Sequence, residues 1–490
     1  MKAEDKKLND IFNGNRRFVV PFFQRQYVWD EPQWERFQRD MENLTTDKRN
    51  YFLGSVIFKQ QLTATGSVGD VRTIIDGQQR LTTLVIFLKV LCTKTNNNNT
   101  FFDTVFRVLV NNNGVFRRES AINHSLLDQQ AFELVINNNA DVQLPGKSQI
   151  IRAYNYFQQG VDPEKVTIAD IQQHLQFVVI DLEASENEQL IFDTINTIGL
   201  RLTTAELLKN YCFSADDINT YNNIWRPVFE DDDETISYWN DKITKGRMKQ
   251  NIIETFFYYF LQIKIQDKSI GISSSDIKNQ YRRSDNLFEN YKSLVEKYGL
   301  SKIQLAQEIA KYGAIFKDNF DPNVCSTEIH QSASIERINL LIWEMDCTTL
   351  IPYVMQVLVS VDDVNERNEI YSILEAYLMR RAIAGSVNKE YYDLFGEQLL
   401  GAEYCSAAGL KKYLDARAEG AILQIPSFDK MLEGTYSQKW NNDKARVVLY
   451  MMETKNTHQS IQLYFARLSL TSSNTSYRRN GQRIGRFLAM

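Results

Sequence analysis

The sequence predicts an α+β protein, in which a mixed α/β region comes first and a mostly α-helical region follows. Strand-like and helix-like patterns alternate between residue 18 and about residue 215. Long amphipathic helical patterns then run to about residue 455, and the 490 residues include only 8 prolines. Hydrophobic residues make up 43% of the chain and charged residues 24%, which is typical of a folded globular protein.

The first region contains short apolar runs rich in Val, Ile and Phe, a composition that favours buried strands. We expect strands at residues 18–21, 52–58, 71–75 and 177–180.

Helical spacing of apolar residues separates these runs. Residues 31–44 place Trp34, Phe37 and Met41 on one face, and residues 78–92 have the same periodicity. The stretch 71–92 is therefore predicted to be a strand, a tight Asp-Gly turn and a helix. Three asparagine-rich stretches, at 96–99, 111–113 and 137–139, are expected to be loops or helix ends.

The later part of the chain reads as helical, for example at 252–263 and 365–383. Three domains are predicted: 1–215, a mixed α/β domain; 216–455, a helical domain; and 456–490, a short tail.

Charge and composition exclude several classes of protein. The net charge of −5 gives no overall basic surface, although a local basic groove for DNA remains compatible with it. The 5 cysteines and 4 histidines are scattered, which argues against a disulfide framework or a zinc site. The first residues lack an apolar signal region, and no apolar stretch reaches the roughly 18 residues of a membrane span. We therefore expect a cytoplasmic protein without a membrane partner.

The stretch Ile74–Thr83 (IIDGQQRLTT) carries the most chemical information. A strand that turns at a glycine into a helix aims backbone N–H groups and the positive end of the helix dipole at one point. Gly77 permits close approach of the backbone, and Arg80 could bind phosphate oxygens. Asp76 could orient Arg80, hold a metal or cap the helix. A capped helix with a surface arginine is the structural alternative.

Three segments around this turn indicate a family. PFFQRQYVW at 21–29, YFLGSV at 51–56 and DGQQRLTTL at 76–84 occur in this order and closely resemble the N-terminal domain of GmrSD-type restriction proteins. That domain is related to ParB and sulfiredoxin, whose equivalent Gly-x-x-Arg turn binds nucleotide phosphates. The resemblance implies a nucleoside triphosphate held with a divalent cation, expected to be Mg²⁺. The implied pocket consists of Gln24, Arg25, Gly54, Ser55, Asp76, Gly77, Gln78, Gln79, Arg80, Thr82 and Thr83.

Hydrolysis of a nucleotide would also need a water molecule held in position. Asp76 and Gln78 are the two catalytic candidates for that role, and the residues by themselves do not choose between them. The identity of the metal ligands stays open.

A second segment, residues 192–210, is similar to another motif of the same family. It contains Asn196, Lys209 and Asn210, which are secondary site candidates. The alternative is structural, because Thr203 or Thr204 would cap a helix in which Glu206 stands at capping-box distance. Ile198 occupies a position where many relatives carry a small polar or basic residue.

The paired arginines Arg380 and Arg381 resemble the helical middle of the family more loosely. Paired arginines on a helix are more often solvated or salt-bridged than in contact with DNA.

Full-length relatives end in an HNH-type nuclease that opens with a string close to I-E-H-I-L-P-Q-x-W, and this string is missing here. Codons that encode residues 472–481 can, when read two bases later, encode I-E-H-I-L-P-Q-K-W. We therefore expect that a frameshift before Ser472 replaced the nuclease with an out-of-frame tail. Sequencing of the gene tests this, because the alternative frame should continue as an HNH nuclease.

Two classes of function compete at this stage. The first is a nucleotide-binding and NTP-hydrolysing regulatory component of a restriction or phage-defence system, whose partners would be DNA and either a nuclease chain or further copies of itself. The second is a non-catalytic, nucleotide-gated module that binds DNA or protein, or an inactive remnant of a restriction endonuclease. A P-loop enzyme is disfavoured because GxxxxGK[ST] is absent, and redox chemistry because no cysteine lies beside the turn.

Overall fold

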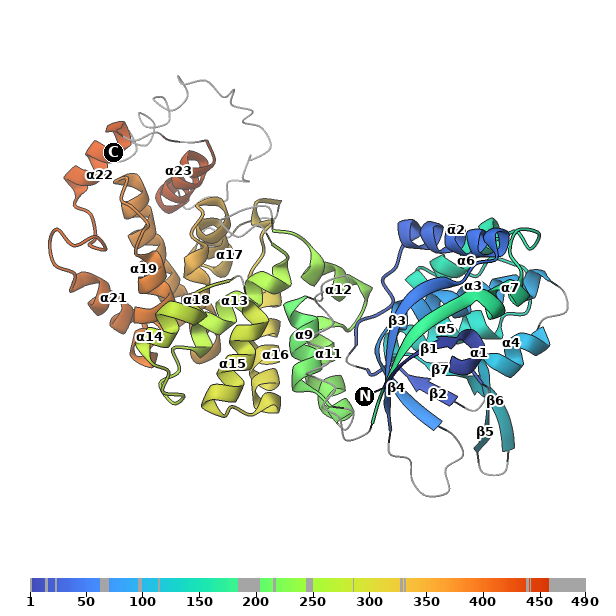
Figure 1. The fold of residues 1–490 in the computed structure, drawn as a ribbon. Coiled ribbons are helices and arrows are strands. Elements are labelled where there is room, and N and C mark those ends of the chain that lie inside the picture. The colour runs from blue at the N-terminus through green and yellow to red at the C-terminus, as the bar shows by residue number, and fades with distance from the viewer. Residues whose placement is uncertain are drawn as a thin grey trace. The chain divides into compact units, whose positions relative to one another are not determined.

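The computed structural model describes residues 2–457, except 14–15, 23, 62–69, 96–98, 113–114, 184–202, 215–216, 244–249, 285, 327–328, 330–331, 438–439 and 441. The chain divides into two compact units, Met1–Ile218 and Asn219–Met490. The first unit contains a β-sheet with helices and the second is helical, which confirms the predicted α+β class (Figure 1).

A six-stranded sheet, in the order β1-β8-β3-β4-β2-β7, organises the described part of the first unit. β3 pairs antiparallel with β4 and parallel with β8, while β4, β2 and β7 run parallel. The strands are β1 Lys2–Lys7, β2 Arg16–Val19, β3 Tyr51–Gln60, β4 Asp70–Asp76, β7 Ile122–Asn123 and β8 Leu175–Leu182.

One face of this sheet packs against helices to form the core of the first unit (Figure 1). Phe18 and Phe58 of the sheet share this core with Leu84 and Phe87 of α3, all at 0% exposure. The helices of this unit are α1 Leu8–Ile11, α2 Glu31–Asp47, α3 Gln78–Lys94, α4 Asn99–Val105, α5 Leu126–Asn137, α6 Gln149–Gly160, α7 Ile168–His174 and α9 Thr204–Cys212.

The prediction for residues 111–113 was partly wrong. Asn111 and Asn112 belong to strand β5, Arg107–Asn112, which pairs antiparallel with β6, Val115–Ser120. Asparagine disfavours strands on average, but cross-strand hydrogen bonding in a hairpin overrides that preference.

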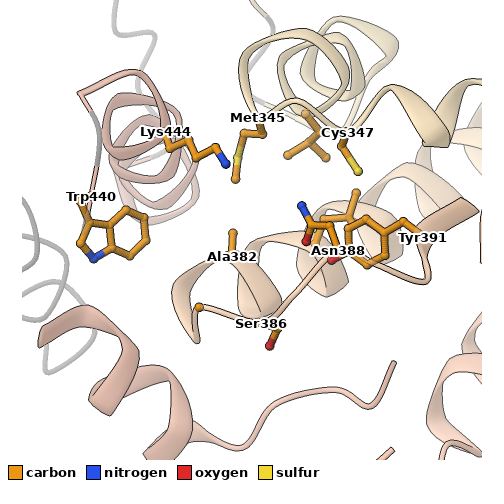
Figure 2. A pocket seen from close by; sticks show the side chains of 11 residues that line it. Met345, Cys347, Ala382, Ser386, Asn388, Tyr391, Trp440 and Lys444 are labelled. Carbon is orange, nitrogen blue, oxygen red and sulfur yellow. The ribbon is translucent and has the colours of Figure 1, made fainter. Parts of the chain in front are cut away.

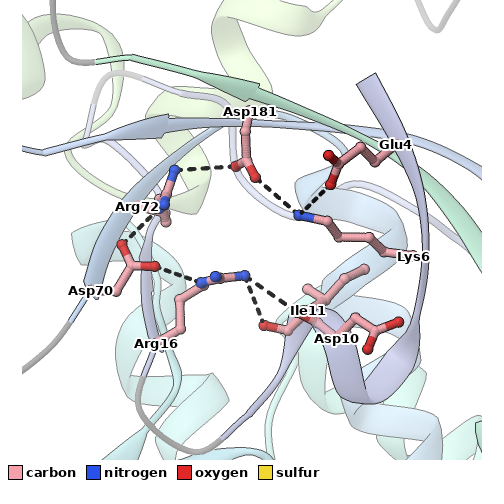
Figure 3. Close-up of polar contacts among 8 residues, drawn as sticks. All are labelled: Glu4, Lys6, Asp10, Ile11, Arg16, Asp70, Arg72 and Asp181. Carbon is pink, nitrogen blue, oxygen red and sulfur yellow. Dashed lines mark hydrogen bonds and ion pairs between the residues drawn. The ribbon is translucent and has the colours of Figure 1, made fainter. Parts of the chain in front are cut away.

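Charged side chains link four strands of the sheet, as Figure 3 shows. Lys6 on β1 and Arg72 on β4 both reach Asp181 on β8, with N–O distances of 3.2 Å each. Asp70 accepts from Arg72 at 2.7 Å and from Arg16 on β2 at 2.8 Å. Partial burial by itself would raise the pKa of Asp70, but the two arginines outweigh it, so that the pKa lies below its ordinary value. This charge network links β1 to β8, β8 to β4 across β3, and β4 to β2.

The second unit is built from packed helices. Its π-helical segments are η2 Tyr221–Trp225, η3 Ile277–Tyr281, η5 Leu340–Glu344 and η7 Leu394–Gln398. Its short 3₁₀ helices are η4 Val324–Ser326, η6 Thr348–Leu350 and η8 Ala402–Tyr404. The α-helices are α10 Ile218–Thr220, α11 Arg226–Phe229, α12 Asp233–Asn240, α13 Ile252–Lys264, α14 Ser274–Asp276, α15 Leu287–Tyr298, α16 Lys302–Asn319, α17 Ile335–Asn339, α18 Ile351–Ser360, α19 Val364–Ile383, α20 Tyr391–Asp393, α21 Ala407–Asp415, α22 Phe428–Ser437 and α23 Asn442–Thr457.

The core of the second unit contains buried charge. Arg337 on α17 makes a two-pronged contact with Glu375 on α19, at 2.8 and 2.7 Å, and also donates to Thr454 on α23 at 2.9 Å. Arg337 is 1% exposed and Glu375 is 2% exposed. A buried pair of this kind ties three helices together.

Most of the predicted elements are confirmed with small shifts of their ends. α2 buries Trp34, Phe37 and Met41, as expected, and α13 and α19 occupy the predicted ranges 252–263 and 365–383. In the portion of the chain that the structure describes, none of the helices combines the length and the apolar character needed to cross a membrane.

Candidate functional site

The turn between β4 and α3 strongly favours glycine at position 77. β4 ends at Asp76, and α3 begins at Gln78. Gly77 has φ +94°, and a Cβ atom there would lie 2.6 Å from Cγ1 of Val56 on β3. Two properties of glycine therefore matter at this turn: it adopts the positive φ without strain, and it has no Cβ to collide with Val56.

The side chain of Arg80 lies across β3 and remains partly open to solvent. Its Nη1 donates to the carbonyl oxygen of Ser55 at 2.8 Å and lies 3.7 Å from Oδ2 of Asp76. A Cβ on Gly54, where φ is +130°, would come within 3.0 Å of the Arg80 Nε. The exposed fraction of the side chain is 31% for Arg80 and 36% for Asp76. The structure thus brings together Gly54, Ser55, Asp76 and Arg80, which the sequence placed in one pocket.

Two glutamines at the start of α3 hold the preceding segment 25–28 by its backbone. Gln79 donates to the carbonyl of Gln26 at 3.0 Å and accepts from the N–H of Val28 at 2.9 Å. Gln78 donates to the carbonyl of Arg25 at 2.6 Å. Both glutamines are buried, and their hydrogen bonds to the backbone of this segment fix the position of Arg25 relative to the turn.

Gln24 is also buried and anchors the other end of that segment. Its amide nitrogen donates to the carbonyl of Ile74 at 2.6 Å and to that of Ile75 at 3.2 Å. This side chain holds the segment on β4 and does not face solvent.

Thr82 and Thr83 lie inside the core, although the sequence placed their hydroxyls in the pocket. Thr83 is 0% exposed, donates to the carbonyl of Gln79 at 2.8 Å and lies 2.7 Å from the hydroxyl of Tyr27. Thr82 is 1% exposed and lies 3.2 Å from Nε2 of His124. A ligand on the surface does not reach these two hydroxyls, so their hydrogen bonds instead hold the start of α3 in place.

Two groups near the turn remain open for contacts. The guanidinium of Arg25 is partly exposed and has no partner among the described residues. The side-chain oxygen Oε1 of Gln78 is buried and likewise lacks a hydrogen-bond donor within the described structure. Gly77, the N-cap residue of α3, has no side chain to accept a hydrogen bond from the first N–H groups of this helix.

Sequence reasoning missed two buried titratable residues behind the turn. Asp128 accepts the N–H of Tyr27 at 2.6 Å, and burial raises its pKa to about 6. Burial lowers the pKa of His124 to about 3, so this histidine is neutral next to Thr82. Both residues follow β7, far from the turn in sequence, and no local motif marks them.

The second candidate segment is described only in part. Thr203 caps α9, and Glu206 completes the capping box with an Oε2 to N distance of 2.7 Å, as predicted. Lys209 is 3% exposed, and Asn210 is partly buried on the same helix. Asn196 and the tail from 458 onward, including Ser472, lie outside the described residues.

A metal-binding group of three or more His, Cys, Asp or Glu side chains was not found within the described ranges. A divalent cation bound at the described residues would therefore need further ligands, for example phosphate oxygens and water.

The fold and the turn define the first unit as an α/β domain with an arginine at the N-terminus of a helix. Residues 8–213 match the family model of the GmrSD restriction endonuclease, N-terminal domain. The first part of the chain therefore contains a domain of the kind found at the N-terminus of GmrSD restriction endonucleases, which confirms the predicted resemblance for residues 8–213. A search of curated proteins found no match.

Proposed function

We propose that the first unit binds a nucleoside triphosphate at the turn between β4 and α3 and hydrolyses it as the regulatory step of a restriction system. The observation that carries this proposal is the partly exposed Arg80, next to Asp76, at the uncapped start of the 17-residue helix α3. An arginine and a helix N-terminus both attract phosphate oxygens.

Each residue of the site has a distinct role in this proposal. Arg80 and Arg25 bind the phosphates, and the N–H groups at the start of α3 add further donors. Gly77 leaves room for Val56 and Gly54 leaves room for the Arg80 side chain, so that the turn forms and Arg80 lies across β3. Asp76 fits a Mg²⁺ ion that phosphate oxygens and water also coordinate, because Mg²⁺ is commonly held by one or two carboxylates with substrate phosphates.

Gln78 is the better of the two candidates for orienting the attacking water. Its nitrogen donates to the carbonyl of Arg25, and its buried oxygen lacks a donor among the described residues. An unsatisfied buried acceptor costs about 1–3 kcal/mol, which a hydrogen bond from a bound water would relieve. Asp76 is instead engaged by Arg80, at 3.7 Å. A glutamine that orients water is a known solution in other nucleotide hydrolases.

Phosphate release by the full chain with each nucleoside triphosphate and Mg²⁺ tests the proposal. Arg80→Ala should abolish binding and turnover, and Gln78→Ala should lower turnover at least tenfold with binding retained. Arg36→Ala, a change of a 78% exposed arginine on α2, should leave both unchanged. If the wild type does not bind any nucleotide, the proposal is wrong.

A non-catalytic nucleotide gate is the second candidate, because the side-chain oxygen of Gln78 is buried in the structure. Binding that depends on Arg80 without any phosphate release would select this candidate. In either case we propose that DNA is the target of the system and that a nuclease partner chain or further copies of this chain complete it.

A further inference from the structure

Positive charge that is free to meet a ligand lies on a β-ribbon of the first unit, away from the pocket of the second unit. That pocket has a volume of about 190 Å³ and is bordered by Met345, Tyr391 and Trp440, among others (Figure 2). Lys444 is the one charged side chain among the described residues that line it, and this lysine already has an interaction partner. The ribbon consists of β5 and β6, and its arginines are only partly neutralised.

The ribbon is anchored at its base and open farther out. β5 and β6 pair antiparallel in a two-stranded sheet, separate from the six-stranded sheet. At the base, the N–H of Ala121 donates to the carbonyl of Phe106 at 2.8 Å, and both residues are buried. Farther along β5, Leu109 is 53% exposed, and Figure 1 shows the ribbon extending away from the core of this unit. The part of the ribbon around Leu109 is therefore accessible to a partner.

Two arginines of β6 lack an acidic partner among the described residues. Both Arg117 and Arg118 are exposed. Arg117 makes no hydrogen bond or ion pair within the described structure. Arg118 donates through Nη1 to the carbonyl oxygen of Asp103 at 2.5 Å, which leaves its charge without a carboxylate. A guanidinium has five N–H donors, so both side chains retain donors for an anionic partner.

The carboxylates around the base of the ribbon are already bound by other arginines. Glu119 on β6 accepts from Nη2 of Arg17 on β2 at 2.9 Å. The carboxylate of Asp103 on α4 lies 3.5 Å from Nη1 of Arg107 on β5. These pairs neutralise one another, and the charges of Arg117 and Arg118 remain in excess.

The pairing register distributes the two free arginines over both faces of the ribbon. Arg118 lies opposite Leu109, and Arg117 lies opposite Val110. Residues directly opposite each other in an antiparallel pair share a face, and successive residues point to opposite faces. One face therefore combines an arginine with the exposed Leu109, and the other face has an arginine as well.

This combination of shape and charge matches duplex DNA. The major groove of B-form DNA admits a two-stranded β-ribbon, and phosphates border the groove on both sides. Arginine binds phosphate oxygens and guanine, while an apolar side chain can contact the methyl group of thymine. The major groove of A-form RNA is too narrow for such a ribbon, so the same charges fit an RNA duplex less well.

We propose that the ribbon of β5 and β6 enters the major groove of duplex DNA, with Arg117 and Arg118 on phosphate oxygens and Leu109 as an apolar contact. This inference rests on the proposed function only in taking DNA as the target of the system. It assigns the contact to a surface that is distinct from the turn between β4 and α3.

Fluorescence anisotropy of a labelled DNA duplex of roughly two helical turns, titrated with the full chain without nucleotide, tests this surface. Replacement of both free arginines, Arg117→Gln with Arg118→Gln, should weaken binding at least tenfold. It should also lower the slope of log affinity against log salt concentration by about 2, because each phosphate contact contributes about 0.9. Leu109→Ser should weaken binding about twofold to threefold and leave the slope unchanged, since it removes no charge.

A matched variant removes the same charge from another exposed surface. Arg36→Gln with Arg39→Gln changes two exposed arginines of α2 and should alter DNA affinity less than twofold. An RNA duplex of the same sequence should bind at least fivefold more weakly than the DNA duplex. All of these positions are exposed, so circular dichroism should show an unchanged fold for each variant.

The possible outcomes separate the ribbon from the broader proposal. The ribbon is not the DNA contact if its double variant binds as tightly as wild type, or if the α2 variant loses as much affinity. Equal binding of the RNA duplex would contradict insertion into the major groove. If the wild type does not bind DNA at all, DNA as the target of the system is wrong as well.

Discussion

The two units bury polar side chains for different purposes. In the first unit the buried polar groups at the turn, Gln24 and Gln79, are neutral amides that hold backbone. In the second unit three of the deeply buried polar side chains are charged, namely Arg337 with Glu375 and Arg381 on carbonyl oxygens.

This difference helps to distinguish side chains that position the backbone from side chains that can contact a ligand. A neutral amide can be buried at moderate cost if it is hydrogen-bonded, whereas an ion needs a partner or several carbonyls. At the turn, the amides are therefore inside and the charged Asp76 and Arg80 remain about one-third exposed. In the second unit the ions are sealed and stabilise helix packing.

The largest expected effect comes from breaking the buried ion pair of the second unit. Glu375→Ala leaves Arg337 charged without its carboxylate and should lower the free energy of unfolding of this unit by about 3–5 kcal/mol. Guanidinium denaturation followed by circular dichroism measures this.

Two further variants control that measurement. Glu433→Ala, an exposed change on α22, should cost less than about 0.5 kcal/mol. Replacement of both partners, Glu375→Leu with Arg337→Met, should recover much of the loss. If Glu375→Ala costs no more than Glu433→Ala, the pair does not stabilise the unit.

The next largest effect concerns glycine. Gly77→Ala forces a Cβ to 2.6 Å from Val56 at a left-handed φ, and it should cost about 2–4 kcal/mol. Gly299→Ala at the end of α15 has φ +66° but no atom within 4 Å, and it should cost only about 1 kcal/mol. Thermal unfolding of both variants gives the comparison. Equal losses would show that space at the turn is unimportant.

A pH dependence is expected from Asp128. Its pKa is raised from 3.8 to about 6 in the folded chain, so ionisation of the buried carboxyl disfavours the folded state. The stabilisation from the protonated form is complete below pH about 4 and is lost as the pH rises through about 6. Asp128→Asn should therefore gain stability relative to wild type between pH 4 and 7.5, by no more than about 3 kcal/mol.

Denaturation of wild type and Asp128→Asn across this pH range tests the expectation. Asp47→Asn at the exposed end of α2 serves as the control and should give a flat difference. A flat difference for Asp128→Asn as well would contradict the raised pKa.

The smallest effect is expected in the charge network of the sheet. Asp70→Asn removes the carboxylate that Arg16 and Arg72 share, and it should cost about 1 kcal/mol at pH 7 because the group is part-exposed. The pKa of Asp70 is lowered, so its contribution is present at neutral pH and disappears as the pH falls through that lowered value.

The matched control is Asp5→Asn on the exposed side of β1, which should change stability little at any pH. An Asp70→Asn penalty that persists at pH 2 would show that charge is not its cause.

The sequence by itself determined most of the local structure of this protein. Apolar spacing predicted α2, α3, α13 and α19, and the Asp-Gly step predicted the turn at 76–77. The capping-box pair Thr203 and Glu206 also predicted the start of α9. These features depend on residues within a few positions of one another, so a single stretch of sequence contains their physical cause.

Only the tertiary structure decided which polar residues face inward. Thr82, Thr83 and Gln79 resemble ligand contacts in the sequence but are buried against segment 25–28 and His124. Arg381 resembles a surface arginine, yet it lies among carbonyls from 387 to 424. Exposure depends on contacts between segments far apart in the chain, and hydrophobic periodicity does not encode those contacts.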